Sequence, residues 1–378
     1  MRAIVIGGGV IGAAVAYRLA EAGTSVTLIE AGRIAEGTSL TSFAWVSACE
    51  KIDSDSYYRL SLAAVSAHRD LASELGALGA WYHRPGVIQW SGADYEGLAL
   101  AESPLQRKLA RLASLGYPAE AIGPEDLARI EPGLHPDALG IEAQAIHYPE
   151  DGYIEAPLMI GTLIGVAIAR FGLELRTHMP VRRLTVTNGE ATGVETASGE
   201  VLSADVVINC AGRWANDVVG NPDFAIPLAS TLGLVAYTPA VGTTIGKVLR
   251  TPNLNLRADG GGRLLLRAND LDDSLTADDA ARPDHPAAIE LARRLGALVP
   301  ALAGIHAEAV RIATRPIPKD GLPCVGQLPG LGNYWVAVTH GGINTSAFIG
   351  IAMRDEILQG RAAPEYAPYR PDRFKAAA

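Results

Sequence analysis

Three glycines and one acid near the start of the chain have the types and spacing of a phosphate-binding turn. Gly7, Gly9 and Gly12 complete a G-x-G-x-x-G pattern, and Glu30 follows 18 residues after the last of them. The first glycine permits a tight turn, the second lets the backbone approach a pyrophosphate, and the third lets a helix pack closely on a strand. An acid at this distance accepts hydrogen bonds from ribose hydroxyls and repels a 2′-phosphate. The pattern therefore predicts dinucleotide binding.

The residues around these glycines supply the elements that such a turn needs. Residues 2–6 are a short apolar run typical of a strand covered on both faces, and residues 25–29 predict the next strand. Between them, residues 13–22 are small and apolar and predict a helix. The start of that helix offers free N–H groups and partial positive charge to phosphates. The alternative is a glycine-rich turn that serves packing alone.

Composition bounds the class of protein. A chain of 378 residues predicts two domains or one elaborated domain, and its 48% hydrophobic and 19% charged residues are typical of a globular enzyme. The net charge of -9 argues against nucleic acid and anionic membrane as partners. Cys49, Cys210 and Cys324 are far apart, so they predict neither a disulfide framework nor a metal site, and they favour a reducing, cytoplasmic location. The apolar stretch 158–171 is too short to cross a bilayer, and we expect neither a membrane segment nor a signal peptide.

The rest of the chain alternates between helical and strand patterns. We expect helices at 57–78, 105–115, 157–171, 287–298 and 345–358, and strands at 81–90 (strand, turn, strand), 181–203 (hairpins), 204–209, 226–267, 305–314 and 334–338. Residues 147–152 predict a turn, and the acidic stretch 270–286 predicts a solvated loop. Because a second strand–glycine–helix unit closes the chain, we expect one nucleotide-binding domain built from separated segments and a cap domain between them.

Four later stretches carry a further pattern. They are Gly37-Thr38-Ser39 followed by Ser42-Phe43-Ala44-Trp45, the strand turn 206–214 ending in Ala211-Gly212-Arg213-Trp214, the stretch 314–323 with Arg315-Pro316 and Asp320-Gly321-Leu322-Pro323, and the turn 339–345. In this order they resemble the D-amino-acid oxidase–type flavoprotein family, which includes glycine oxidase, sarcosine oxidase-like enzymes and bacterial amino-acid dehydrogenases. The resemblance implies an α/β fold, with a Rossmann-type FAD-binding domain (1–80, 146–221 and 312–378) and a substrate domain on a mixed, largely antiparallel sheet (81–145 and 222–311).

The resemblance also implies which residues contact the FAD. They are those of the opening turn, of the four stretches and one position of the hairpins: Gly7, Gly9, Val10, Ile11, Gly12, Glu30, Ala31, Gly37, Thr38, Ser39, Ser42, Ala44, Trp45, Val181, Ala211, Gly212, Trp214, Arg315, His340, Gly341, Gly342, Ile343, Asn344 and Thr345.

Two departures from the family pattern matter. The closing turn continues Thr345-Ser346-Ala347-Phe348, where the family often has Thr-Leu-Ala-Pro, and this affects the contacts near the flavin ring. Sarcosine oxidase-like members join the flavin to a cysteine a few residues before the Asp-Gly position. This chain has Ala313 and Thr314 there, and Cys324 comes after Asp320. We therefore predict that the FAD is bound non-covalently.

Arg315 and His340 are the candidate catalytic residues. A guanidinium grips an α-carboxylate with two parallel hydrogen bonds, and the resemblance implies this role for Arg315. The alternative is a structural arginine that is exposed or paired with Asp320. Hydride transfer from an α-carbon to flavin N5 leaves negative charge on the ring, which the helix start after His340 would stabilise. We expect His340 to hydrogen-bond the flavin and not to move protons, because an amine delivered as the free base needs no protein base.

Other side chains are weaker candidates. Arg250, Arg257 and Arg267 on the cap strands are alternative carboxylate anchors, and Tyr237 either lines the pocket or packs in its strand. We expect His147 to be a loop histidine, and no convergent set of metal ligands is evident.

Three functions remain open. The first is an FAD enzyme that oxidises an amino acid, imino acid or secondary amine to the imine, with O₂ or another acceptor taking the electrons. The second is a catalytic subunit that passes electrons to a partner protein or quinone. The third is a flavin- or nucleotide-binding module without turnover. A nicotinamide dehydrogenase of hydroxy acids is a further rival.

Overall fold

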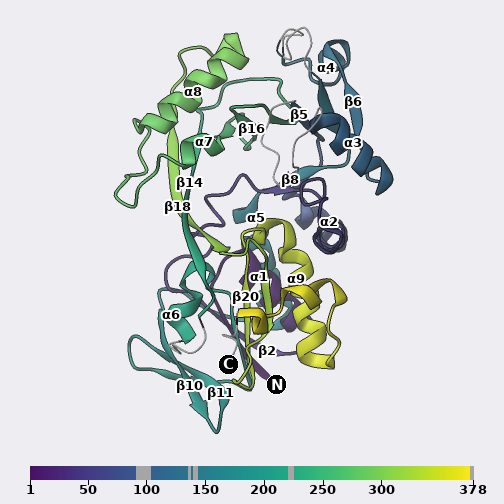
Figure 1. Cartoon of the computed structure of the whole chain (residues 1–378). Coiled ribbons are helices and arrows are strands. Elements are labelled where there is room, and N and C mark those ends of the chain that lie inside the picture. Colours follow the sequence, from purple (N-terminus) through teal and green to yellow (C-terminus); the bar gives the residue numbers. More distant parts are fainter. Residues whose placement is uncertain (91–103, 135–137, 139–143, 220–224, 375–378) are drawn as a thin grey trace.

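The chain folds around two large β-sheets, which lie one above the other in Figure 1. The computed structural model describes residues 1–90, 104–134, 138, 144–219 and 225–374. This arrangement confirms the predicted α/β class, with a Rossmann-type half and a half built on a mixed, largely antiparallel sheet.

The lower sheet has six strands and contains the opening βαβ unit. In order they are β19 (Cys324–Gln327), β20 (Tyr334–Val338), β13 (Val206–Asn209), β1 (Arg2–Ile6), β2 (Ser25–Ile29) and β9 (Glu174–Arg176). All neighbours run parallel except β19 and β20. The central strands β1, β13 and β20 are buried almost throughout, which explains their continuous apolar runs.

Four long helices pack around this sheet. They are α1 (Val10–Glu21), α2 (Asp55–Leu75), α5 (Ala156–Phe171) and α9 (Gly342–Gln359). Helix α1 contacts both α5 and α9. A Cβ at Gly350 of α9 would lie 2.7 Å from the carbonyl oxygen of Ala14, so this glycine permits the close approach of the two helices. The buried stretch at 158–171 is therefore a core helix, although Leu158 and Ile168 on its outer side are exposed.

A small antiparallel sheet and a short helix flank the lower sheet. The sheet is β10 (Val181–Thr187), β11 (Glu190–Thr196) and β12 (Val201–Ser203), and α6 (Ala215–Val219) contacts β10. Asn188 and Gly189 both have positive φ, 53° and 79°, as a two-residue hairpin turn requires. The predicted hairpins are therefore confirmed.

The upper sheet has eight strands. In order they are β18 (Ala309–Pro318), β14 (Leu228–Tyr237), β17 (Leu264–Arg267), β16 (Asn255–Ala258), β15 (Val248–Arg250), β5 (Val87–Trp90), β7 (Ala145–Tyr148) and β6 (Glu120–Ile122). Its helices are α3 (Pro104–Ser114), α4 (Pro124–Ile130), α7 (Asn269–Asp272) and α8 (Pro286–Leu298). The ten-residue pair β14–β18 extends from the upper half toward the lower one (Figure 1). The domain boundaries stay a prediction, and β18 crosses the boundary expected at 312.

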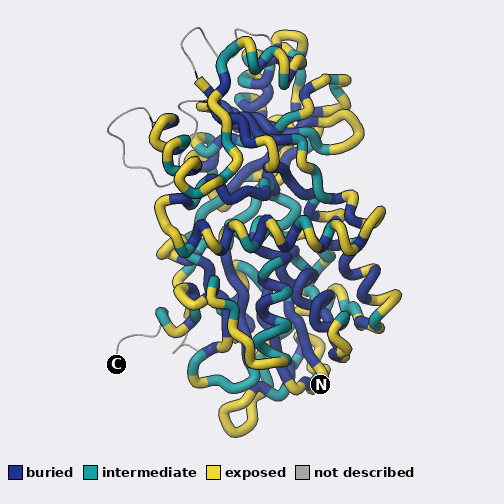
Figure 2. The backbone as a smooth tube through the Cα atoms, turned by 90° about the vertical axis from the view of Figure 1, so that its right-hand side faces the viewer, coloured by how far each residue is buried: buried dark blue, intermediate teal, exposed yellow. Residues whose placement is uncertain are grey.

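Burial follows these elements. In Figure 2 the core strands are buried along their length, whereas the helices alternate between buried and exposed positions. A second small sheet consists, in order, of β3 (Trp45–Val46), β8 (Gly152–Ile154) and β4 (Tyr82–His83). The two strands expected within 81–90 therefore do not pair, because β4 joins this small sheet and β5 joins the upper sheet.

The structure corrects three expectations about individual segments. His147 is a buried residue of β7 and not a loop histidine, because the turn begins only after Tyr148. The acidic stretch 270–286 is not wholly a solvated loop, because α7 lies at its start and buries Asp272. The last helix begins at Gly342, three residues earlier than expected, so Gly342 of the closing turn belongs to its first turn and Gly341 is its N-cap residue.

The turn between β7 and β8 buries a carboxyl group, Asp151. Its Oδ1 accepts a hydrogen bond from the Tyr117 hydroxyl, and its Oδ2 has no hydrogen-bond partner within the described ranges. Burial raises the pKa of Asp151 from 3.8 to about 7, although hydrogen bonds from Tyr117 and Cys49 oppose this change. Between about pH 4 and pH 7 the folded protein therefore holds a proton that the unfolded chain releases.

We expect the contribution of Asp151 to the free energy of unfolding to fall as the pH rises through this window and then to level off, whereas the buried His68, whose pKa is lowered to about 4, contributes in the opposite direction. The substitution Asp151→Asn should remove this loss and raise the free energy of unfolding at pH 8 by up to about 4 kcal/mol. Urea denaturation at pH 4 and pH 8 measures both values, with the exposed Asp278→Asn as the matched control. If Asp151→Asn keeps the full pH dependence of the parent, the stored proton is not at Asp151.

Candidate functional site

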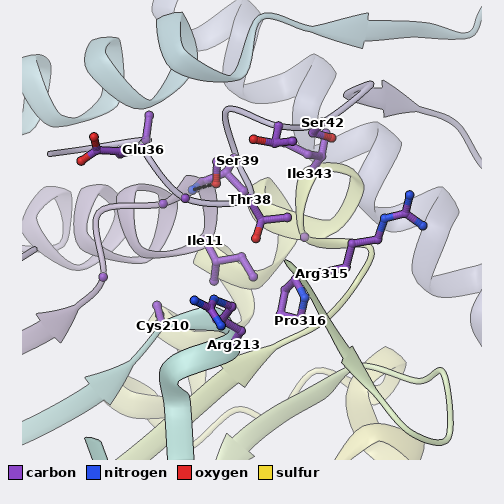
Figure 3. Close-up of a pocket in the computed structure, with 18 of the residues that line it drawn as sticks. Ile11, Glu36, Thr38, Ser39, Ser42, Cys210, Arg213, Arg315, Pro316 and Ile343 are labelled. Atoms are coloured by element: carbon purple, nitrogen blue, oxygen red, sulfur yellow. Dashed lines mark hydrogen bonds between the residues drawn. The ribbon is translucent and has the colours of Figure 1, made fainter. Parts of the chain in front are cut away.

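A cavity of about 670 Å³ lies where the carboxyl ends of the lower strands face the upper sheet. Residues that follow β1, β2, β13 and β20 form one wall, and residues of β14 to β18 form the other. Ligands of open parallel sheets bind at this end of the strands. Figure 3 shows labelled side chains from both walls around this space, with Ile11 near the centre, Cys210 and Arg213 below it, and Arg315 and Pro316 to the right. The cavity is therefore the candidate site.

The opening glycines form the tight corner that the sequence predicts. Gly7 has φ of +105°, and a Cβ there would lie 2.6 Å from the carbonyl oxygen of Cys210. A Cβ at Gly12 would lie 1.9 Å from the carbonyl oxygen of Gly7, so no larger residue fits between helix and strand. The Val10 backbone N–H, at the start of α1, donates to the Ser39 hydroxyl at 3.0 Å, the dashed line of Figure 3.

Glu30 follows directly after β2 and lies on the cavity wall. Its Oε2 accepts a hydrogen bond from the Gly8 N–H at 2.7 Å, and its Oε1 accepts one from the Gly32 N–H at 2.8 Å. These bonds hold the carboxylate in one orientation. Each oxygen keeps a second lone pair, so the side chain can still accept from two ribose hydroxyls.

The closing turn presents the start of α9 to the cavity. The backbone N–H groups of Gly342, Ile343 and Asn344 belong to the first helical turn, where they lack partners within the helix. His68 of α2 holds this turn, because its Nε2 lies 2.9 Å from the Ile343 carbonyl oxygen. Burial lowers the pKa of His68 to about 4, so the ring is neutral at pH 7 and Nε2 donates the hydrogen bond.

The donors and glycines of the cavity fit a dinucleotide such as FAD. Two glycine-rich helix starts, at Gly9 and Gly341, reach the same cavity from opposite ends of the chain. The indole Nε1 of Trp45 is buried on the cavity wall and has no hydrogen-bond partner in the described part of the chain. Leaving such a donor unpaired is costly, so an acceptor on a ligand is expected there.

The cavity brings together nearly all the residues expected to contact the cofactor. Gly12 and Thr345 do not line it. Gly12 packs under the turn, and the buried Thr345 hydroxyl donates to the Gly341 carbonyl oxygen at 2.9 Å. The exposed His340 and Trp214 do line it. Whether each of these residues contacts FAD stays a prediction.

The weaker candidates divide into two groups. Arg250 and Arg267 line the cavity, but Arg257 and Tyr237 do not. Arg257 donates to the backbone carbonyls of Phe43 and Ala258, each at 2.7 Å, and the Tyr237 hydroxyl donates to the Leu40 carbonyl at 3.2 Å. These two side chains therefore join the cap to the loop around residue 40.

Arg315 lines the cavity, but its acidic partner differs from the one considered. It is ion-paired with Asp272, whereas Asp320 pairs with Arg373 at 2.8 Å. Asp272 also accepts from Arg267 at 3.2 Å and from the Leu234 N–H at 2.8 Å. Arg267, Arg315 and Asp272 thus form a cluster with two cations and one carboxylate.

Sequence reasoning missed Asn255 and Gly233 on the cavity wall. Gly233 of β14 lies under the Arg315 side chain, and a Cβ there would lie 2.6 Å from both Nε and one terminal nitrogen of the guanidinium. A glycine inside a strand, where another group approaches closely, was the available signal.

The substitution Gly233→Ala should displace the Arg315 guanidinium. We expect KM for a carboxylate substrate to rise on the order of 10- to 100-fold while FAD content stays unchanged. Steady-state kinetics and the flavin absorbance measure the two quantities. Gly246→Ala is the matched control, because a Cβ at Gly246 would meet nothing within 4 Å. Equal KM values in the two variants would mean that Arg315 does not position the substrate.

Three further findings bear on the site. Within the described ranges, no helix is long and apolar enough to cross a membrane, and no three His, Cys, Asp or Glu residues cluster as metal ligands. All three cysteines are free and buried. Cys210 lines the cavity, whereas Cys324 in β19 does not. Non-covalent attachment of FAD stays a prediction.

Comparisons with known proteins agree with this geometry. A family model described as DAO, FAD dependent oxidoreductase, matches residues 2–356. Glycine oxidase of Geobacillus kaustophilus (strain HTA426) is 26% identical over 375 residues, covering 97% of this chain and 95% of that protein. The crystal structure of glycine oxidase from Geobacillus kaustophilus has a TM-score of 0.84 at 23% identity and covers 99% of this chain and 100% of that chain, which shows the shared fold.

A further relative is much longer than this chain. The mitochondrial pyruvate dehydrogenase phosphatase regulatory subunit of Mus musculus is 26% identical over 268 residues, which are 70% of this chain. The matched region spans only 28% of that protein.

Proposed function

The chain belongs to the DAO family of FAD-dependent oxidoreductases, and from this premise we propose that it oxidises the C–N bond of an amino acid, imino acid or secondary amine to the imine. The observation that carries the proposal is the position of the Arg315–Arg267–Asp272 cluster. Its two arginines line the same cavity that the glycine turns of α1 and α9 enter, and Asp272 pairs with both of them. A carboxylate bound there would lie beside the expected cofactor.

The side chains have separate tasks in this reaction. FAD, when bound, supplies the acceptor for a hydride from the substrate α-carbon. Arg315 would hold the α-carboxylate with charge-assisted hydrogen bonds and so fix the direction of the α C–H bond. The free N–H groups at the start of α9 would stabilise the negative charge that arrives on the acceptor side.

The substrate side of the reaction balances without a protein base. The neutral amine contributes its lone pair to the new C=N bond as the hydride leaves, and water then hydrolyses the iminium to an oxo acid and an amine or ammonia. His340 would donate a hydrogen bond at the cavity mouth and move no proton. The amine must therefore enter as the free base.

The electron acceptor is a separate part of the proposal. We favour O₂, which would take two electrons and two protons and leave as hydrogen peroxide, because glycine oxidase is among the relatives that match along nearly their whole length. The alternative is a partner protein or quinone. A non-catalytic module is the third candidate, and the regulatory subunit among the relatives is its one support. The free cysteines are consistent with a reducing compartment such as the cytoplasm.

Anaerobic flavin reduction tests the reaction directly. The purified protein should be yellow, and a panel of L- and D-amino acids, N-methyl amino acids and cyclic imino acids should include at least one compound that bleaches it. Admitting air should restore the colour quickly and release hydrogen peroxide, whereas an enzyme that uses a partner would recover only slowly in air and quickly when a quinone or dye acceptor is added. A yellow protein that no member of the panel bleaches would contradict amine oxidation.

A further inference from the structure

The upper sheet places a row of polar side chains across the cavity. In the strand register Arg250 of β15 lies opposite Asn255 of β16, which in turn lies opposite Arg267 of β17. Directly opposed residues point to the same face of a sheet, and neighbouring strands are about 4.8 Å apart. Arg250 and Arg267 therefore stand about 10 Å apart along the sheet. All three side chains line the cavity.

The two ends of this row are separate cationic groups. At one end Arg267 and Arg315 share the single carboxylate of Asp272. At the other end Arg250 shares Glu50 with the buried Lys108, and its guanidinium lies 4.3 Å from the centre of the Trp45 ring. Each cationic group is held in place by its own carboxylate, Asp272 or Glu50, so its arginines do not have to move to meet a ligand.

The arginines also act on one another through the cavity. Burial lowers the pKa of Arg267, and the positive charges of Arg315 and Arg250 lower it further. Three guanidinium groups that repel one another across a common space are stabilised when anions enter that space. A planar guanidinium can form two parallel hydrogen bonds with a carboxylate, which the compact charge of a lysine ammonium group cannot do.

We propose that the substrate is an amine with two carboxylates, an amino dicarboxylate. The inference rests on the proposed amine oxidation and adds a second anchor to it. The α-carboxylate binds at Arg315 and Arg267, the second carboxylate binds at Arg250, and the Asn255 amide between them is placed to hydrogen-bond the chain of the substrate. Arg250 and Asn255 would thus determine specificity, because a monocarboxylate fills only one end of the row.

Binding of redox-inert acids tests the two-point site without turnover. Malonate, succinate and glutarate are titrated into the yellow protein against acetate, propionate and butyrate, and binding is followed by the change in the flavin spectrum. We expect at least one dicarboxylate to bind roughly 10- to 100-fold more tightly than its matched monocarboxylate. Sulfate, a compact dianion, should not share this advantage, because it cannot reach both ends.

Variants locate the second anchor. Arg250→Met should lower the affinity for the dicarboxylate much more than the affinity for its matched monocarboxylate, and so remove the advantage of the dicarboxylate. Arg293→Met removes the same charge from an exposed position on α8 and should leave the advantage intact. If Arg250→Met does not fold, the comparison of dicarboxylates with monocarboxylates on the unaltered protein still tests whether the site has two anchors. Equal affinity for matched acids, or sulfate binding as tight as the best dicarboxylate, would overturn the proposal.

Turnover separates this inference from the function on which it rests. Anaerobic bleaching should be faster, in kcat/KM, with aminodicarboxylic acids than with alanine, proline or sarcosine, by roughly 10- to 100-fold. Bleaching by monocarboxylates at an equal rate would overturn the second anchor and keep amine oxidation. Tight dicarboxylate binding without any bleaching would support the anchor and contradict amine oxidation.

Discussion

Replacing Arg315 with methionine should lower kcat/KM for a carboxylate substrate by about 10²- to 10³-fold. The guanidinium lines the cavity and is held by Asp272, so its removal takes away a charge-assisted, oriented contact with the substrate. The loss should appear mainly in KM, because the expected contact exists in the bound substrate as well as in the transition state. Stopped-flow flavin reduction at several substrate concentrations separates binding from hydride transfer.

The partner acid provides the control for this variant. Arg315→Met leaves Asp272 with Arg267 as its remaining ion-pair partner, and a stability change could follow from that alone. Urea denaturation of Arg315→Met measures that stability change, which we expect to be small because the remaining charges, Asp272 and Arg267, still balance one another. Arg315→Lys should recover only part of the activity, because it keeps the charge but loses the planar fork. A KM in Arg315→Met equal to that of the parent protein would remove Arg315 from the substrate site.

The parts of the site that depend on local sequence could be predicted. One contiguous βαβ unit contains the glycine turn of Gly7, Gly9 and Gly12 and the acid Glu30. Each of these residue types is required by steric contacts or hydrogen bonds to residues nearby in the chain. The hairpin turn at Asn188 and Gly189 is local in the same sense. Such features are visible because the interacting groups are close in the chain.

Contacts between distant segments could not be predicted. Arg315 of β18 pairs with Asp272 of α7, 43 residues earlier. This happens because Leu234 of β14 holds Asp272 and β14 pairs with β18, in a register that no local pattern encodes. The nearby Asp320 was the closer acid in sequence, but it belongs to a surface pair with Arg373. The row of Arg250, Asn255 and Arg267 likewise exists only when three strands are in register.

Some predicted ends of strands and helices differ from the observed ends, because a polar residue or a glycine belongs to the strand or helix. His147 stands beside a Pro-Glu-Asp-Gly turn, but β7 extends through it to Tyr148 and buries its ring. At the other end of the chain, the glycines at 341 and 342 signal a loop, although Gly342 already has helical geometry. Glycine is unfavourable inside a helix, yet a first turn that presents its N–H groups to a ligand gains from the missing side chains.

Gly12→Ala should yield a colourless protein that has lost its FAD and unfolds more readily by roughly 3 kcal/mol or more. The added Cβ would lie 1.9 Å from the Gly7 carbonyl oxygen, and because this is a backbone atom, no flexible side chain can move away to relieve the clash. Either α1 must shift from the sheet or the phosphate turn must open. Visible absorbance of the purified protein and urea denaturation measure the two effects.

The same substitution on another helix shows that the position, and not the residue type, is responsible. A Cβ at Gly165 in α5 would meet nothing within 4 Å, and this glycine is exposed. Gly165→Ala should therefore keep the yellow colour and raise the free energy of unfolding by about 0.5–1 kcal/mol, because alanine is the better helix former. If Gly12→Ala retains full FAD absorbance and matches Gly165→Ala in stability, the glycine corner does not hold the cofactor.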